Sequence, residues 1–140
     1  MPDIYFWGRV VSTDARIGNL RDVILVYIYR AFSRGKADIP QLDRNDLMFA
    51  PFGINQLPWS KGFFETVKNV ENGPEDLLSC HCFRWVNPVS NQVKYVNEYG
   101  ERLEGVVESC GIYAMRGYVG VDKDVSEYVM NHLGAEKVIK

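Results

Sequence analysis

The sequence predicts a mostly-β domain of the α+β class, in which an antiparallel, barrel-like or strongly twisted sheet is followed by one short C-terminal helix. Aromatic residues make up 13% of the chain, as eight Tyr, seven Phe and three Trp, and aromatic side chains favour the half-buried surfaces of sheets. Short apolar runs alternate with turn residues along most of the chain, which is typical of strands. Apolar residues at helical spacing occur only near the C-terminal end.

Length and charge limit what the domain can be. One hundred and forty residues correspond to about one domain, so we predict a single domain over residues 1–140. The formal net charge is −2 and charged residues make up 24% of the chain. Proteins that depend on phosphate contacts usually carry a basic face, so this balance argues against nucleic-acid binding.

Seven short strands are expected where apolar and aromatic runs lie between turn signals. They are residues 4–12, 22–29, 47–52, 63–67, 77–85, 92–99 and 112–119. The second strand is the clearest, because residues 23–28 have no polar interruption, which predicts burial on both faces. The first strand ends in turns at 12–14 and around Gly18, so we expect an antiparallel hairpin with a long loop.

The last element is expected to be a helix that packs on the sheet. Asp122 or Asp124 would cap its start, since aspartate is a favoured N-cap residue. Apolar residues then recur every four positions, which places them on one face, and a glycine would end the helix. The stripe and the terminating glycine are Val125, Val129, Leu133 and Gly134.

The compartment is expected to be the cytoplasm. No basic region followed by an apolar stretch opens the sequence, so no signal peptide is predicted. The longest apolar run, residues 23–29, is far short of the ~20 residues that span a bilayer, which argues against a membrane partner. Three cysteines, an odd count, favour reduced thiols over a disulfide framework.

The cluster Cys80-His81-Cys82, together with Cys110, contains residue types that could bind zinc. Neighbouring residues of a strand point to opposite faces, so His81 would not join Cys80 and Cys82 on one ion. We therefore expect both thiols on the core face of the strand and His81 on the other, with no metal and no cofactor.

Catalytic patterns are weak, so the protein is not expected to be an enzyme. A Cys–His nucleophile could use His81 or His132, but only Arg84 lies near to lower a thiol pKa. Serine-hydrolase elbows and phosphate-binding loops are absent from the sequence. Carboxylates could converge as an acid–base pair, although no pair stands out. These are Glu65, Glu98, Glu101, Glu104 and Glu108.

Residues 53–62 are expected to form an extended loop that carries Trp59. This loop and the following Phe63 bring several large aromatic residues close together. Trp59 could fold back over the sheet edge as a structural lid. Alternatively, it could serve as the aromatic anchor of a protein–protein interface.

Residues 57–67 (LPWSKGFFETV) resemble the L-P-W-x-x-G-[YF]-F-x-T-[VI] signature of the immunity protein 26 family of bacterial polymorphic toxin systems. Residues 8–10 are similar to its early G-R-V strand, and residues 81–83 are similar to an H-x-F strand near the middle of its sequence. Residues 112–125 are similar to its closing strand and short helix. The resemblance spans Gly8 to about Leu133. It implies a mostly-β fold and a non-enzymatic role in binding and neutralising a toxin, usually one encoded by a neighbouring gene.

The sequence departs from the family pattern at its start. Similar proteins tend to have a strand with G-D-[VI]-F before the G-R-V strand, whereas only a few residues precede Gly8 here. Either residues 4–7 replace that strand or it is missing. A missing strand would expose a sheet edge and invite pairing with a second copy of the protein.

We therefore expect an immunity protein that occludes the active surface of its toxin. If the toxin is a nuclease with a basic cleft, acidic residues would speed association. The expected partner-binding residues combine aromatic anchors with carboxylates. They are Trp59, Phe63, Glu65, Glu71, Glu75 and Asp76.

Two other functions remain open. A small SH3-like or β-barrel module would bind nucleic acid or a peptide through short strands and exposed aromatic residues. An enzyme would use the region of Cys80, His81 and Cys82.

Overall fold

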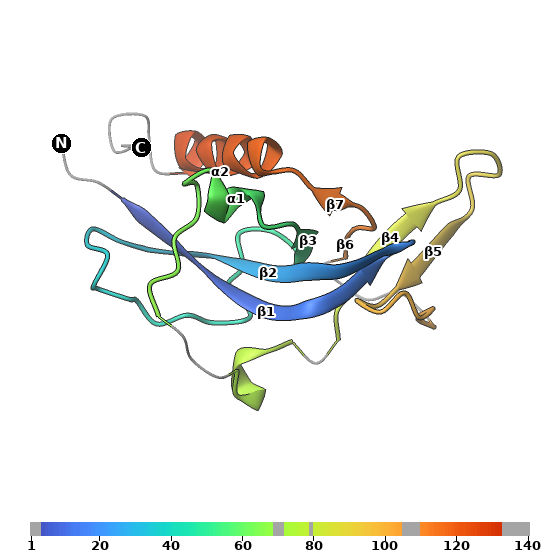
Figure 1. Ribbon diagram of the computed structural model, residues 1–140, viewed down its shortest axis with the longest axis horizontal. Coiled ribbons are helices and arrows are strands. Elements are labelled where there is room, and N and C mark those ends of the chain that lie inside the picture. Colours follow the sequence, from blue (N-terminus) through green and yellow to red (C-terminus); the bar gives the residue numbers. More distant parts are fainter. Residues whose placement is uncertain (1–3, 69–71, 79, 105–109, 133–140) are drawn as a thin grey trace.

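The computed structural model describes residues 4–68, 72–78, 80–104 and 110–132 (Figure 1). A main sheet has the strand order β1-β2-β3-β7 and a small sheet the order β5-β4-β6. The predicted fold class is confirmed: the described part of the protein is mostly twisted sheet with a C-terminal helix, and both of its sheets stay open rather than closing into a barrel. The bounds are β1 Tyr5–Ile17, β2 Leu20–Ser33, β3 Phe52–Ile54, α1 Leu57–Ser60, η1 Pro74–Asp76, β4 Phe83–Val86, β5 Val93–Val96, β6 Gly111–Ile112, β7 Met115–Arg116 and α2 Tyr118–His132.

Strands β1 and β2 form the expected antiparallel hairpin, but its long loop and its turn at residues 12–14 were predicted wrongly. The strands are joined by a tight turn in which Gly18 has a φ of 58°. Residues 12–14 stay inside β1, where the register shifts around Ser12 and Ala15. Such bulges accommodate extra residues within a strand pair. Because β1 is an edge strand, polar residues of this segment can stay exposed to solvent within it.

The outer edge of β1 is partly occupied by other segments. The Asn72 side-chain amide donates to the carbonyls of Val10 and Val11, at 3.4 and 3.1 Å. The amide of Arg16 donates to the carbonyl of Glu98, at 2.7 Å. The backbone groups of Val10, Val11 and Arg16 at the edge of β1 are therefore already hydrogen-bonded within the protein and are not available to pair with a second copy.

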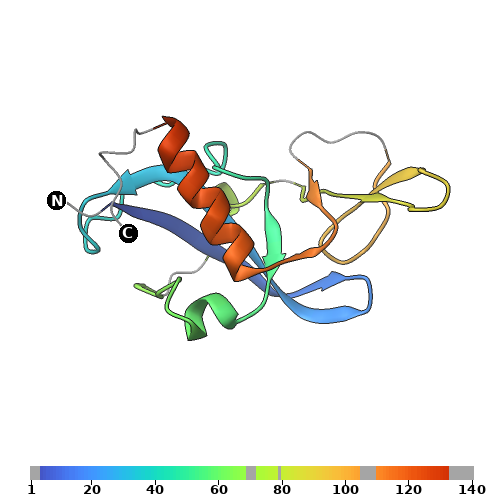
Figure 2. The ribbon, with the colours of Figure 1, turned by 90° about the horizontal axis from the view of Figure 1, so that it is seen from above.

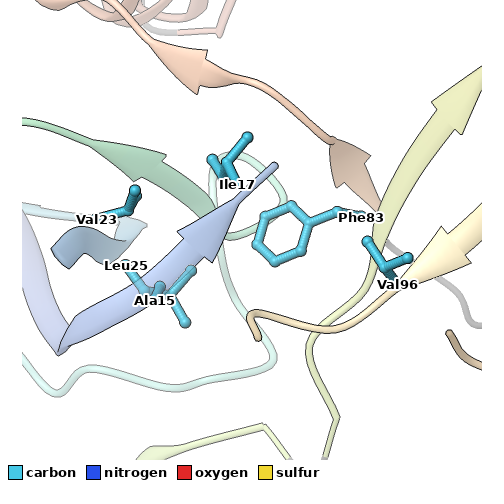
Figure 3. Close-up of a cluster of buried hydrophobic side chains, with 6 residues drawn as sticks. All are labelled: Ala15, Ile17, Val23, Leu25, Phe83 and Val96. Carbon is cyan, nitrogen blue, oxygen red and sulfur yellow. The ribbon is translucent and has the colours of Figure 1, made fainter. Parts of the chain in front are cut away.

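The central part of β2, residues 23–29, is buried on both faces, as its uninterrupted apolar run predicts, whereas both ends of the strand are more exposed. On one face, Phe83 and Val96 of the small sheet pack against the hairpin (Figure 3). On the other face, Val26 and Ile28 pack against β3 and Val121 of α2. Helices α1 and α2 both lie on this second side of the hairpin (Figure 1). The helices therefore cover one face of the hairpin, and the small sheet packs at the end of the hairpin that carries its turn (Figure 1).

Two strands expected in the first half are wrong. Residues 63–67 are not a strand, because the amides of Phe63 and Phe64 both donate to the carbonyl of Pro58, at 2.8 and 3.0 Å. These bonds fold the backbone back onto α1. The expected strand 47–52 is reduced to a single bridge between Leu47 and Tyr29. Strand β3 and helix α1 replace most of the extended loop expected at 53–62.

The second half differs from the prediction in where its elements begin and end. The expected strand 77–85 becomes regular only at β4, and 112–119 splits into β6 and β7, because the Ala114 amide donates to the Ile112 carbonyl and turns the backbone. Helix α2 starts before Asp122, and Asp124 pairs with Arg116 of β7 instead of capping the helix. Leu133 and Gly134 lie outside the described residues. No described helix is long and apolar enough to cross a membrane.

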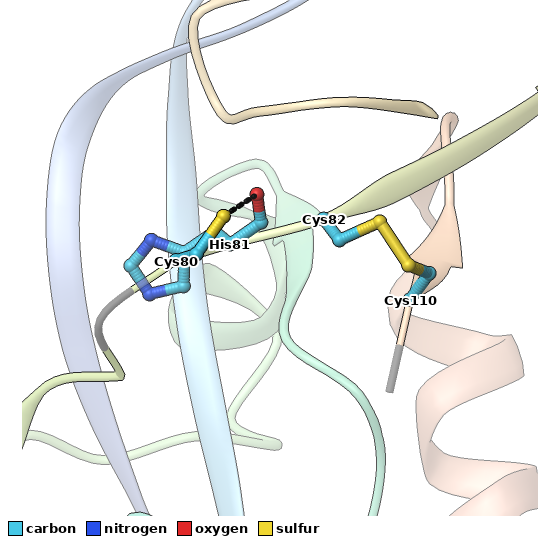
Figure 4. The surroundings of a disulfide bond; sticks show 4 residues. All are labelled: Cys80, His81, Cys82 and Cys110. Atoms are coloured by element: carbon cyan, nitrogen blue, oxygen red, sulfur yellow. Dashed lines mark hydrogen bonds between the residues drawn. A yellow bond between two sulfur atoms is a disulfide. The ribbon is translucent and has the colours of Figure 1, made fainter. Parts of the chain in front are cut away.

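The expectation of reduced thiols is wrong for two of the three cysteines. Cys82 and Cys110 form a disulfide (Figure 4). Strands β4 and β6 are parallel, with Phe83 opposite Gly111, so the residues preceding each of them are neighbours. Cys80 has a free thiol and is exposed, so it does not lie on the core face with Cys82.

Candidate functional site

Helix α1 projects aromatic side chains from a tight local fold. The Asn55 side chain accepts the amide of Leu57 at 3.0 Å, and proline occupies the first turn, where its missing amide proton costs no hydrogen bond. Gly62 has a φ of 83°, a conformation that favours glycine, and it reverses the backbone after the helix. This reversal places Phe63 and Phe64 against α1.

Trp59 and Phe63 take different positions on this fold. Trp59 is half-buried, lies 5.1 Å from the ring of Phe64 with the rings nearly perpendicular, and packs on the core beneath. Phe63 is 48% exposed and lies 5.1 Å from the ring of Tyr118 at the start of α2. Trp59 is thus braced by the core while Phe63 faces solvent.

A depression of about 310 Å³ lies beside α1. Trp59 forms part of its wall, and the hairpin contributes Val10 and Ile24. Val10 and Leu57 are 41% and 42% exposed. We call Val10, Leu57, Trp59, Phe63 and the depression the α1 surface. Its full lining is Val10, Thr13, Ile24, Gln56, Trp59, Ser60 and Thr66.

The acidic residues expected at the interface do not gather at the α1 surface. Glu65 follows Phe63, but its carboxylate is 2.8 Å from the ammonium of Lys36. Glu75 and Asp76 are in η1, on the opposite side of the hairpin from α1 (Figure 1). Glu71 lies outside the described residues. The structure therefore divides the expected site between two faces of the main sheet.

Asp76 has a structural role in η1. Its carboxylate accepts the amide of Gly73 at 2.9 Å and lies 3.7 Å from the guanidinium of Arg9. Arg9 also donates to the hydroxyl of Tyr29 at 3.2 Å and to the side chain of Asn72 at 3.0 Å. These bonds hold residues 72–76 against β1 and β2. Glu75 is exposed.

A buried polar network that the sequence did not indicate joins Tyr27, His81 and Glu98. The Tyr27 hydroxyl lies 2.5 Å from His81 Nε2, and His81 Nδ1 bonds the Glu98 carboxylate. His81 is only 7% exposed, so the prediction that it faces away from the core is wrong. Tyr27 sits inside an apolar run and Glu98 next to a turn, and no spacing connects them to His81.

The hydrogen bonds of this network form one chain. The Leu78 amide donates to the Tyr27 hydroxyl oxygen at 2.9 Å, and the same hydroxyl lies against His81 Nε2. The other ring nitrogen, Nδ1, donates its proton to the Glu98 carboxylate. The Tyr27 hydroxyl and both ring nitrogens of His81 are thereby satisfied.

Burial and this network shift two pKa values. Burial raises the pKa of Tyr27 above 10.0. Burial also acts to raise the pKa of Glu98, but the hydrogen bond and charge of His81 act in the opposite direction, and the net pKa lies below 4.5. Tyr27 has no exposed surface, so no substrate reaches its hydroxyl, and the network links segments of the fold.

The structure also bears on the metal and nucleophile alternatives. The described residues include no group of three or more His, Cys, Asp or Glu side chains arranged to hold a metal ion. The Cys82 sulfur is bonded to Cys110 and is not a thiolate. The free Cys80 thiol points to the carbonyl of His81, 3.6 Å away (Figure 4).

Fold and site together define a small two-sheet protein with an aromatic surface depression at a short helix. No protein-family model, no curated protein and no solved structure matches this sequence.

Proposed function

We propose that this protein is an immunity protein that binds a cognate bacterial toxin and neutralises it by covering the toxin's active surface with the α1 surface. The observation that carries the proposal is that α1 and the turn after it expose Leu57 and Phe63, while Trp59 of the same helix lines a depression. Aromatic anchors at the centre of a contact supply most of the binding energy in protein interfaces. The same residues belong to the run that resembles the immunity protein 26 family.

The α1 surface suits binding because its anchors are pre-positioned. Trp59 packs against the core and Phe64, so a partner would not have to order it, and immobilising a free side chain costs affinity. Phe63 is steadied by Tyr118 while keeping almost half of its surface exposed. A toxin loop could bury this area without rearranging the main sheet.

Charge contributes less to the proposal than the sequence suggested. The Glu65 carboxylate near Phe63 is already paired with Lys36, and Glu75 and Asp76 lie on the other side of the hairpin. The proposal therefore rests on apolar contact, and it holds for a nuclease or for any other toxin that exposes an apolar surface. It places the complex in the cytoplasm.

Co-expression with the product of the adjacent gene tests the proposal. The intact protein should restore growth and co-purify with that product, whereas Phe63→Asp should do neither. Val89→Asp is a matched control, because Val89 is 92% exposed in the β4–β5 turn, away from α1. The proposal fails if the intact protein neither rescues growth nor co-purifies, or if both variants bind equally well.

A further inference from the structure

The small sheet has an unfilled position at one end. Strand β6 pairs with β4 only at Phe83 and Arg84. The Tyr113 amide still donates to the Arg84 carbonyl at 2.9 Å, and then the Ala114 amide bonds the Ile112 carbonyl and turns the backbone away. Strand β4 continues to Val86. Seen from above, β4 and β5 extend well past β6 (Figure 2).

Val86 presents its backbone to this open side. Alternate residues of a strand direct their amide and carbonyl groups to the same side, so Val86 is oriented like Arg84. On its other side β4 pairs with β5. The backbone bonds to β5 are made by the residues that alternate with Arg84 and Val86, as the Asn87 amide shows by donating to the Gln92 carbonyl at 2.8 Å. Among the described residues, no hydrogen bond is made by the Val86 backbone, so an added strand that continued the line of β6 would meet a donor and an acceptor there.

A depression of about 430 Å³ lies next to this position. Ile112 and Val86 are 70% and 39% exposed, although outward-facing positions of an open sheet are usually polar. The walls combine aromatic, aliphatic and cationic side chains, the types enriched at protein interfaces. The lining is Arg84, Trp85, Val86, Cys110, Gly111, Ile112 and Tyr113.

The charge at this end of the sheet is positive. Arg84 is exposed and forms no ion pair with any residue of the described segments. The Lys94 ammonium lies 4.7 Å from the centre of the Trp85 ring. No acidic residue among those described lines the depression, so a carboxylate brought beside Arg84 would gain an attraction that no lining residue cancels.

We propose that this open edge, formed by Arg84, Val86 and Ile112, accepts an extended segment of a partner protein that presents apolar side chains and a carboxylate on the same face, two residues apart. The segment adds a strand beside Val86, as in other cases of strand addition to a sheet edge. Its apolar side chains cover Val86 and Ile112, and its carboxylate meets Arg84. This surface is distinct from the α1 surface and does not depend on the function proposed above.

A second copy of the protein fits this edge less well. Two identical edges related by a two-fold axis contact each other through the same residues. Antiparallel pairing about Val86 would set Arg84 opposite Pro88 of the other copy, which has no amide to donate and no carboxylate to attract Arg84. An acidic partner segment supplies both.

A peptide-binding experiment on the intact protein tests the proposal. The probe is a short peptide of Val-Thr-Glu-Thr repeats, in which valine and glutamate lie on the same face of an extended strand. It is compared with a peptide that has lysine for glutamate and with one N-methylated on alternate amides. Backbone NMR shifts should be confined to Arg84, Val86 and residues 111–113. The lysine peptide should bind about fivefold more weakly, near the upper limit for one exposed ion pair, and N-methylation should abolish binding.

A charge exchange provides the control for non-specific adhesion. Arg84→Glu should reverse the preference, so that the lysine peptide binds more tightly than the glutamate peptide, with the fold unchanged. Equal affinity for both peptides, shifts located at α1, or no binding at millimolar peptide would overturn the proposal. Concentration-dependent shifts at Val86 without peptide would instead assign the edge to a second copy and also overturn it.

Discussion

At the scale of single residues, the hydroxyl of Tyr27 connects the main sheet to two other segments. It bonds the Leu78 amide and His81 Nε2. We expect Tyr27→Phe to lower the free energy of unfolding by about 1–3 kcal/mol, because both partners would stay buried without a hydrogen bond. Chemical denaturation measures this loss. Tyr99→Phe is the control, since Tyr99 is 48% exposed, and equal effects of the two changes would contradict the structural role of the network.

Ionisation of Glu98 makes the free energy of unfolding depend on pH in the acid range. Its pKa is lower in the folded protein than the ordinary 4.5, so the unfolded state binds more protons between these two values and stability rises with pH there. The contribution of Glu98 is complete above pH 4.5 and is lost as the pH falls through the folded-state pKa. Glu98→Gln should flatten the acid limb of stability measured by denaturation from pH 7 downwards. An unchanged acid limb would show that other carboxylates control it.

At the scale of elements, β3 must approach the hairpin closely. A Cβ atom at Gly53 would lie 2.6 Å from Val23 Cγ1 and 2.8 Å from Ile17 Cδ1. Gly53→Ala should therefore destabilise the protein by about 1–3 kcal/mol, as overpacking does in a filled core. Thermal or chemical unfolding measures the change.

Gly120 in α2 provides the matched control. A Cβ atom there has no neighbour within 4 Å, and alanine favours a helix over glycine by about 0.5–1 kcal/mol. Gly120→Ala should therefore stabilise the protein. If both alanine variants were destabilised equally, close packing of β3 would not be the cause at Gly53.

Elements were predictable from the sequence where local pattern and burial agree. Strand β2 is apolar over its central run and is buried on both faces, so its pattern indicated its position correctly. Residues 63–67 are as rich in aromatic residues as a strand, yet two of their amides donate to the Pro58 carbonyl instead of to a neighbouring strand. The spacing of apolar residues along the sequence does not reveal these local hydrogen bonds. Helix α2 was expected from the spacing of Val125 and Val129, but it starts earlier than either aspartate indicated, because only Gly117 separates it from β7.

At the scale of the whole molecule, the residues expected at the partner interface do not all lie together. Trp59 and Phe63 are close in sequence, so a local fold was sufficient to bring them to one surface. Asp76 follows further along the chain, but it lies in η1, on the opposite side of the hairpin from α1 (Figure 1). Which side of a sheet a segment reaches depends on long-range pairing, for which the sequence alone carried no signal.

The Cys82–Cys110 disulfide connects β4 to β6 over a sequence separation of 28. In the chain-entropy model, a loop of this length gives about 3–4 kcal/mol of stability. The double change Cys82→Ser with Cys110→Ser should cost about that amount in chemical denaturation, and a thiol reductant should have a similar effect on the intact protein. Cys80→Ser is the control, because Cys80 is free and exposed.

The outcome also bears on the compartment. Thiols are kept reduced in the cytosol of most organisms, so the proposed cytoplasmic complex requires a reduced protein that still folds and binds. The packing of Phe83 and Val96 against the hairpin does not involve the disulfide, and we expect it to keep the small sheet in place after reduction. The double serine variant should therefore still rescue growth with the adjacent gene product. If the double serine variant failed to fold while the intact, oxidised protein folded, the working protein would belong in an oxidising compartment.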